Sequence, residues 1–125
     1  MIQKLLLVFA GGGLGAVLRW HLGGLVLHRT ADWRFPLSTF VVNVVGCLAA
    51  GLLAGLVVKL DQFGANARLF LFTGLLGGFT TFSAFGVETV HLLRRHEYNV
   101  ALAYVLLSVI CGVLGLWVAL WLIPE

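Results

Sequence analysis

The residues of this chain that could do chemistry are polar groups set into long apolar segments. They form two stripes at helical spacing, Thr39, Asn43, Gly46 and Ala50 in one segment and Tyr104, Ser108, Gly112 and Gly115 in another. Polar groups at bilayer depth are costly unless they find partners or line a wet cavity. The matching stripes therefore predict facing polar surfaces, which either hold helices together or line a path for a polar solute.

A third polar feature lies near the middle of another apolar segment. Gly77, Gly78, Thr80 and Thr81 are poor helix formers and predict a helix break at that point. A break frees backbone carbonyls, which can coordinate a cation when they are buried in protein or line a cavity. Phe82 and Phe85 follow on one face, and an aromatic ring edge is electropositive, so it can face an anion.

Charges constrain the solute further. Glu88 is the only carboxylate within a likely span, and the first span carries no acid, only Arg19. Proton-coupled exchange usually needs an acid deep in the bilayer, whereas the deep polarity here is neutral or cationic and suits an anion. Glu88 either lies in a vestibule or pairs with a basic residue such as Arg95.

The elements that must position these groups are membrane-spanning helices. Hydrophobic residues make up 61% of the 125 residues and charged residues only 10%, and a soluble domain is about a quarter charged. Long charge-free runs approach or exceed the roughly 20 residues that a spanning helix needs. We predict one transmembrane channel domain over residues 1–125, with spans at roughly residues 3–27, 36–58, 69–93 and 98–123.

The loop charges do not favour one orientation in the membrane. With four spans, one side carries Lys4, Lys59 and Arg68, and the other carries Arg29, Arg34, Arg94 and Arg95. A difference this small leaves the topology to other signals, or it indicates dual topology with an antiparallel dimer. Four short helices enclose little lumen, so we expect oligomerisation. Gly11-x-x-x-Gly15 and Gly51-x-x-x-Gly55 serve either packing within the chain or a dimer seam.

Three motifs together resemble those of the Fluc/CrcB fluoride channels. Gly77-Gly78-Phe79-Thr80-Thr81-Phe82-Ser83-Ala84-Phe85 resembles their third-helix signature. Gly11-Gly12-Gly13-Leu14-Gly15-Ala16-x-x-Arg19-Trp20 resembles their first-helix motif, and Pro36-Leu37-Ser38-Thr39-x-x-x-Asn43-x-x-Gly46 their second. Length, spans and charge balance agree, so the resemblance covers essentially the whole chain.

The resemblance implies an all-α membrane protein with four transmembrane helices, the third broken near its middle, assembled as an antiparallel, dual-topology homodimer. It implies a channel and not an enzyme, one that exports fluoride passively through two pores of a bacterial-type inner (cytoplasmic) membrane and relieves fluoride toxicity. The expected partners are the fluoride ion, a second identical subunit and the lipid bilayer, with no nucleic acid.

The resemblance also implies roles for individual residues. Phe82 and Phe85 would form an aromatic box that contacts fluoride, and Asn43 would hydrogen-bond the ion or orient the rings. A polar track along the pore would consist of Thr39, Tyr104 and Ser108. The vestibule would be lined or supported by Arg19, Thr81 and Ser83. The backbone carbonyls of Gly77 and Thr80, from both subunits, would hold a central structural Na+ ion.

The chain departs from the family pattern at four positions. Thr and Ser are usual where this chain has Ala84 and Gly86, Gly is usual at Ser38, and some members place a serine at Gly112. These departures put side-chain hydrogen bonds at Ala84 and Gly86 in doubt, and they shorten the expected track at Gly112.

Two other functions remain as alternatives. A proton-coupled small multidrug exporter shares the size and topology but relies on a first-helix glutamate, which this chain lacks. A structural subunit, for example one that binds haem through histidines, would use His21, His28, His91 or His96, which all lie near segment ends. An intramembrane enzyme is disfavoured because no Ser/His or paired-acid constellation lies at depth.

Overall fold

The computed structural model describes residues 1–60 and 63–124, and within that part the chain is helical and has no strands. Four helical stretches are long and apolar enough to cross a membrane, Ile2–Thr30, Leu37–Leu60, Ala65–Arg94 and Tyr98–Trp121. The first two are the helices α1 and α2, and the last is α6. The prediction of an all-α chain with four candidate membrane spans is confirmed.

The third stretch is composite. It consists of α3 (Ala65–Arg68), the π-helix η1 (Leu69–Leu76), α4 (Gly77–Phe79) and α5 (Phe82–Arg94). Between α4 and α5, Thr80 and Thr81 are extended, with φ/ψ of −82°/153° and −145°/118°. The glycines before them favour helix weakly. The Thr80 N–H still closes onto the Leu76 carbonyl oxygen at 3.0 Å, so the Thr81 N–H is the backbone donor at this point that needs a partner elsewhere.

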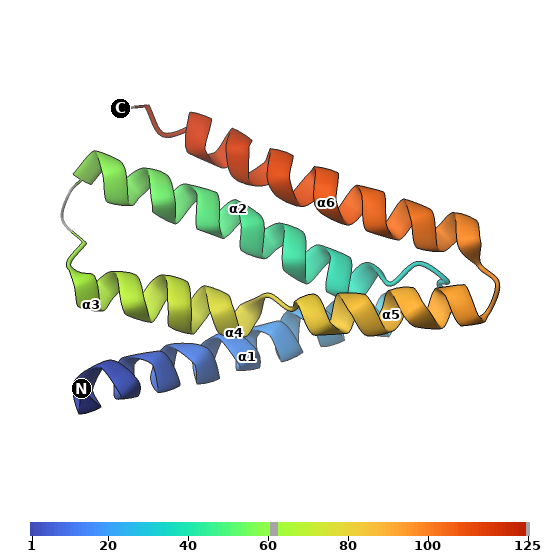
Figure 1. The fold of residues 1–125 in the computed structure, drawn as a ribbon, viewed down its shortest axis with the longest axis horizontal. Coiled ribbons are helices and arrows are strands. Elements are labelled where there is room, and N and C mark those ends of the chain that lie inside the picture. The colour runs from blue at the N-terminus through green and yellow to red at the C-terminus, as the bar shows by residue number, and fades with distance from the viewer. Residues whose placement is uncertain (61–62, 125) are drawn as a thin grey trace.

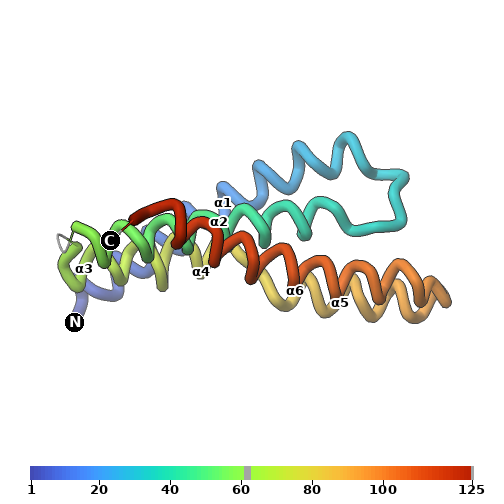
Figure 2. The backbone as a smooth tube through the Cα atoms, turned by 90° about the horizontal axis from the view of Figure 1, so that it is seen from above, coloured from blue at the N-terminus to red at the C-terminus, as the bar shows by residue number. Residues whose placement is uncertain are grey.

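The helices run along one long axis (Figure 1). The start of α1, the start of α3 and the ends of α2 and α6 lie at one end of the molecule, whereas the α1–α2 and α5–α6 connections lie at the other. Seen from above, the second half of α1 diverges from α5 and α6 (Figure 2). The divergence begins near the extended residues, so the two halves of the bundle are packed differently.

Close packing in one half depends on glycine. A Cβ on Gly15 would overlap the Leu75 carbonyl, and one on Gly11 would lie 2.6 Å from the Phe70 carbonyl oxygen. In the other pair of helices, a Cβ on Gly51 would lie 2.5 Å from the Leu116 carbonyl oxygen of α6. Both glycine pairs therefore pack helices within one chain, where such small residues let backbones approach. Of the two interpretations left open by the sequence, packing within the chain is the one observed.

The best-covered core lies at the other end, near the α5–α6 connection. It is formed by Leu92, Ala101 and Tyr104, and Tyr104 has 0% of its surface exposed. The partly buried side chains of Phe35, Phe40, Phe85 and Val100 surround it. This cluster fixes α5, α6 and the start of α2 against one another close to the predicted polar track.

Candidate functional site

The second extended residue, Thr81, is held by the side chain of Asn43, which lies on α2. Asn43 Nδ2 donates to the Thr81 carbonyl oxygen at 2.9 Å, and Asn43 Oδ1 accepts from the Thr81 N–H at 2.8 Å. One amide thus pairs with both backbone groups of Thr81, the residue that caps α5. Two of the side chain's hydrogen-bonding positions are used in this way, and its second N–H is left over for another acceptor.

The same contacts redirect the donors of the neighbouring helical turns. In a continuous helix the Thr81 N–H would close onto the Gly77 carbonyl, but here it is donated to Asn43. The Ala84 N–H would likewise close onto the Thr80 carbonyl, but it is donated to Thr81 Oγ1 at 3.2 Å. Gly77 and Thr80 therefore carry carbonyls whose usual helical donors are engaged elsewhere, and an electropositive ligand could bind them.

The missing side chain of Gly46 leaves room for Thr80. A Cβ on Gly46 would overlap Thr80 Cγ2 and would lie 3.3 Å from Phe79 Cδ1. Gly46 follows Asn43 by three residues, so both lie on the same face of α2. This face of the first polar stripe therefore packs against the extended residues and does not line an open channel by itself.

Glu88 joins the two polar stripes. Thr39 Oγ1 on α2 donates to Glu88 Oε1 at 2.6 Å, and Tyr104 Oη on α6 donates to Glu88 Oε2, also at 2.6 Å. The alternative that Glu88 pairs with Arg95 is wrong, since the one salt bridge among the described residues joins Arg34 and Glu97. A half-buried carboxylate binds hydroxyl donors here because α2 and α6 bring them to both of its oxygens.

The two phenylalanines of α5 lie side by side. Their ring centroids are 5.6 Å apart with planes inclined by 35°, and Phe85 also contacts Tyr104 at 5.1 Å. Phe82, however, is 83% exposed. One subunit therefore presents the first ring of the pair on its surface, at apolar depth, where either lipid or another protein chain must cover it.

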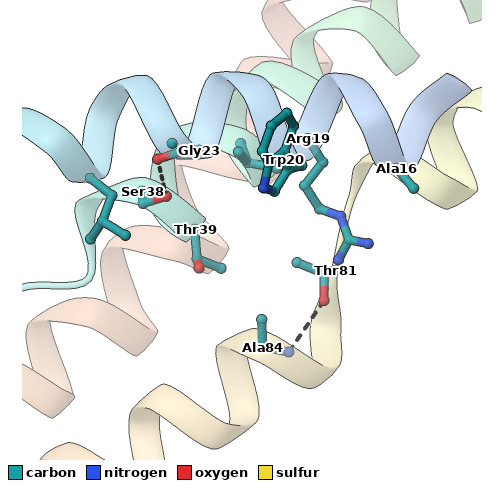
Figure 3. A pocket seen from close by; sticks show the side chains of 11 residues that line it. Ala16, Arg19, Trp20, Gly23, Ser38, Thr39, Thr81 and Ala84 are labelled. Atoms are coloured by element: carbon teal, nitrogen blue, oxygen red, sulfur yellow. Dashed lines mark hydrogen bonds between the residues drawn. The ribbon is translucent and has the colours of Figure 1, made fainter.

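A cavity of about 390 Å³ lies where α1 diverges from α5 (Figure 3). Its polar lining includes Arg19, Ser38, Thr39 and Thr81, and the Arg19 guanidinium points toward Thr81. Ser38, which stands where the family usually has glycine, donates its hydroxyl to the Gly23 carbonyl oxygen at 2.8 Å and so bridges α1 and α2. Thr81 Oγ1 and Ser83 Oγ lie 3.3 Å apart at the start of α5. The cavity thus combines one cation, hydroxyl groups and a helix N-terminus.

Ser108 lies on α6, one turn beyond Tyr104. Its hydroxyl oxygen is buried and has no hydrogen-bond partner in the part of the chain that the structure describes. Among the departures from the family pattern, Ala84 lines the cavity without offering a hydroxyl, and a Cβ on Gly112 would lie 3.3 Å from Cys47 Sγ on α2. A Cβ on Gly86 would meet nothing within 4 Å, so nothing in the structure explains that glycine. Among the described residues of the second stripe, Ser108 therefore carries the buried hydroxyl that has no hydrogen-bond partner.

The model of the family described as "CrcB-like protein, Camphor Resistance (CrcB)" matches residues 6–120. The chain belongs to the CrcB family.

Relatives of this CrcB-family chain cover nearly its whole length. A protein of Methylobacillus flagellatus is 48% identical over 98% of this chain and 95% of its own. A protein of Flavobacterium psychrophilum is 40% identical over 99% of each, and one of Hyphomonas neptunium is 49% identical over 94% of this chain and 92% of its own. Each of these relatives is named "Fluoride-specific ion channel FluC".

In this CrcB-family chain, sequence reasoning did not connect Glu88 with the polar track. A signal was available, because Glu88 follows Phe85 by three residues and so shares its face of α5. That face also meets Tyr104, which the sequence alone places only on the fourth span. The convergence of Thr39, Glu88 and Tyr104 depends on how three helices pack.

Proposed function

We propose that this protein is a fluoride-selective passive channel that exports fluoride across a bacterial-type inner membrane and thereby relieves fluoride toxicity. The observation that carries the proposal is the extended Thr80–Thr81 pair, in which Asn43 holds Thr81 next to Phe82 and Phe85. The relatives of this chain are named for fluoride conduction. This pair would be the break in the third transmembrane helix. Transport without chemical conversion needs no catalytic residue.

The channel would be an antiparallel, dual-topology homodimer. One subunit leaves Phe82 exposed and the Arg19 cavity open on its side, which supports a site completed by a second copy. The near-balanced loop charges support insertion in both orientations. With two antiparallel copies, each pore would combine rings of Phe82 and Phe85 from different subunits into an aromatic box.

A central Na+ ion would sit on the backbone carbonyls of Gly77 and Thr80 from both subunits. The residues fit such an ion, because hard cations prefer oxygen ligands and the helical donors of both carbonyls are engaged elsewhere. The described residues offer no cluster of three His, Cys, Asp or Glu side chains for a metal, so backbone oxygens are the suitable donors. The bound charge would favour an anion nearby.

Fluoride would lose its water to donors along the track. It would enter through the vestibule of Arg19, Thr81 and Ser83, and pass the Asn43 amide and the edges of Phe82 and Phe85. The buried Ser108 hydroxyl is available to donate to it. Thr39 and Tyr104 donate to Glu88, so fluoride must compete with that carboxylate for the hydrogen bonds of their hydroxyl groups. Such competition keeps binding weak enough for release.

Fluoride efflux from liposomes that contain purified protein tests the proposal. Fluoride should leave these vesicles much faster than it leaves empty liposomes, and vesicles loaded with chloride should retain their anion. Fluoride efflux no faster than from empty liposomes would rule out the channel. Equal efflux of fluoride and chloride would rule out selectivity and leave a general anion pore.

A further inference from the structure

Phe35 reaches the cluster of Thr39, Glu88 and Tyr104 from the connection between α1 and α2. Its ring centroid lies 5.3 Å from that of Tyr104, with the two planes at 83°, and 5.4 Å from that of Phe40 at 75°. Edge-to-face contacts of this kind are directional. Phe35 lies outside the two polar stripes and the three motifs, except that it immediately precedes Pro36.

Two rings contact that of Tyr104. Phe85 contacts it at 5.1 Å, Phe35 presents a second contact near a right angle, and no surface of Tyr104 remains exposed. A tyrosine has two side-chain torsions, so a wedged ring leaves its hydroxyl little freedom. The Tyr104 hydroxyl lies 2.6 Å from Glu88 Oε2, and the orientation of the tyrosine ring determines the acceptor to which this hydroxyl donates.

A salt bridge also joins the α1–α2 connection to α6. Arg34 Nε lies 4.0 Å from Glu97 Oε1, at the start of α6. The Arg34 side chain is 76% exposed, and exposed ion pairs contribute little to stability. The ring of Phe35 is therefore the stronger tie between this connection and the α5–α6 core.

We infer that Phe35 is a positioning residue, which holds the Tyr104 hydroxyl in register with Glu88 and thereby sets the conductance of the polar track. The effect on conductance rests on the proposed fluoride channel. The effect on the Tyr104 ring does not, because it depends only on the packing of Phe35, Phe85 and Tyr104.

A double-mutant cycle on flux tests the functional part. Phe35→Ala should slow fluoride efflux from liposomes about three- to tenfold, the range expected for losing one aromatic contact. In a Tyr104→Phe background, which lacks the hydroxyl, the same change should slow efflux less than about twofold, because residues that act through one another are not additive. Phe35→Tyr should restore flux and Phe35→Leu should not. Phe9→Ala, which removes a ring that is 81% exposed on α1, is the matched control and should leave flux unchanged.

The ring itself is observed by ¹⁹F NMR on protein labelled with 3-fluorotyrosine. Tyr98→Phe leaves Tyr104 as the single label, since the chain has 2 tyrosines. We expect one narrow resonance with Phe35 present, and a shifted, broadened or multiple resonance after Phe35→Ala. Equal losses of flux in both backgrounds, full rescue by Phe35→Leu, or an unchanged resonance would each overturn the inference. If the wild type does not conduct fluoride, the proposed function fails and the NMR comparison still decides the role of Phe35.

Discussion

The Asn43 side chain closes two hydrogen bonds on Thr81, one to its carbonyl oxygen at 2.9 Å and one from its N–H at 2.8 Å. An unpaired backbone group at bilayer depth costs several kcal/mol. The amide removes that cost for one residue of the extended pair, and it does so with both a donor and an acceptor. No charged side chain could replace it on both counts.

Asn43→Asp should therefore disrupt the site although the two side chains have nearly the same size and shape. The carboxylate still accepts from the Thr81 N–H, but it cannot donate to the Thr81 carbonyl and it adds negative charge beside the proposed fluoride path. We expect fluoride efflux to fall to the level of empty liposomes, and the free energy of unfolding to fall by about 1–3 kcal/mol. Efflux and thermal unfolding in detergent measure the two effects.

The control for this change is Asn66→Asp, which adds the same charge at an exposed position of α3. Efflux should remain at the wild-type rate in that variant. Wild-type efflux in folded Asn43→Asp protein would place the pore away from Asn43.

Gly46→Ala should displace the extended pair by steric overlap. The added methyl would meet Thr80 Cγ2 and the Phe79 ring, and overpacking of this kind costs about 1–3 kcal/mol. We expect a lower melting temperature and slower fluoride efflux. In Gly64→Ala, by contrast, no described atom beyond the two adjacent residues lies within 4 Å of the new methyl, so both quantities should stay unchanged. Identical melting curves for the two variants would show that Thr80 moves aside without cost.

Phe82→Ala should abolish fluoride efflux while the subunit still folds. The ring is 83% exposed in one chain, so its removal takes little from the packing of that chain. Phe9→Ala removes a ring of similar exposure from α1 and should conduct normally. Circular dichroism reports the helical content of both variants. Normal efflux in Phe82→Ala would contradict the aromatic box.

The protein should be found in both orientations in the membrane. A peptide tag at the C-terminus should be cleaved by an added protease in about half of the molecules of intact inside-out vesicles, and in the rest only after the vesicles are opened. A tag that is cleaved completely, or not at all, before opening would refute dual topology.

Sodium should stabilise the assembled channel. A ligand present at one hundred times its dissociation constant raises the free energy of unfolding by about 2.7 kcal/mol. We therefore expect a higher melting temperature in Na+ than in the larger cations K+ or choline at equal ionic strength. Gly46→Ala, which displaces Thr80, should reduce the difference. Equal melting temperatures in the three salts would argue against a bound sodium ion.

The spans could be predicted from the sequence because lipid imposes a simple requirement, a long apolar helix, which composition alone reveals. The partners of the polar residues could not. Asn43 meets Thr81, and Thr39 meets Glu88, only because α2 packs against the third span in one particular register. Phe35 illustrates the same limit, since no local pattern distinguishes it from a lipid-facing ring. Each of these contacts joins residues far apart in the chain and depends on the interhelical distance that the glycines allow.

The backbone contact between α1 and η1 at Gly11 and Gly15 has a consequence for mutational tolerance. A Cβ at either position would meet backbone atoms. Because no neighbouring side chain can change its rotamer to make room, a residue larger than glycine would push the two helices apart. Farther along α1 the helix borders the cavity, and a Cβ on Gly24 would meet nothing outside its own helical turn within 4 Å. A saturation library selected for growth in fluoride should therefore reject larger residues at Gly11 and Gly15 and accept them at Gly24.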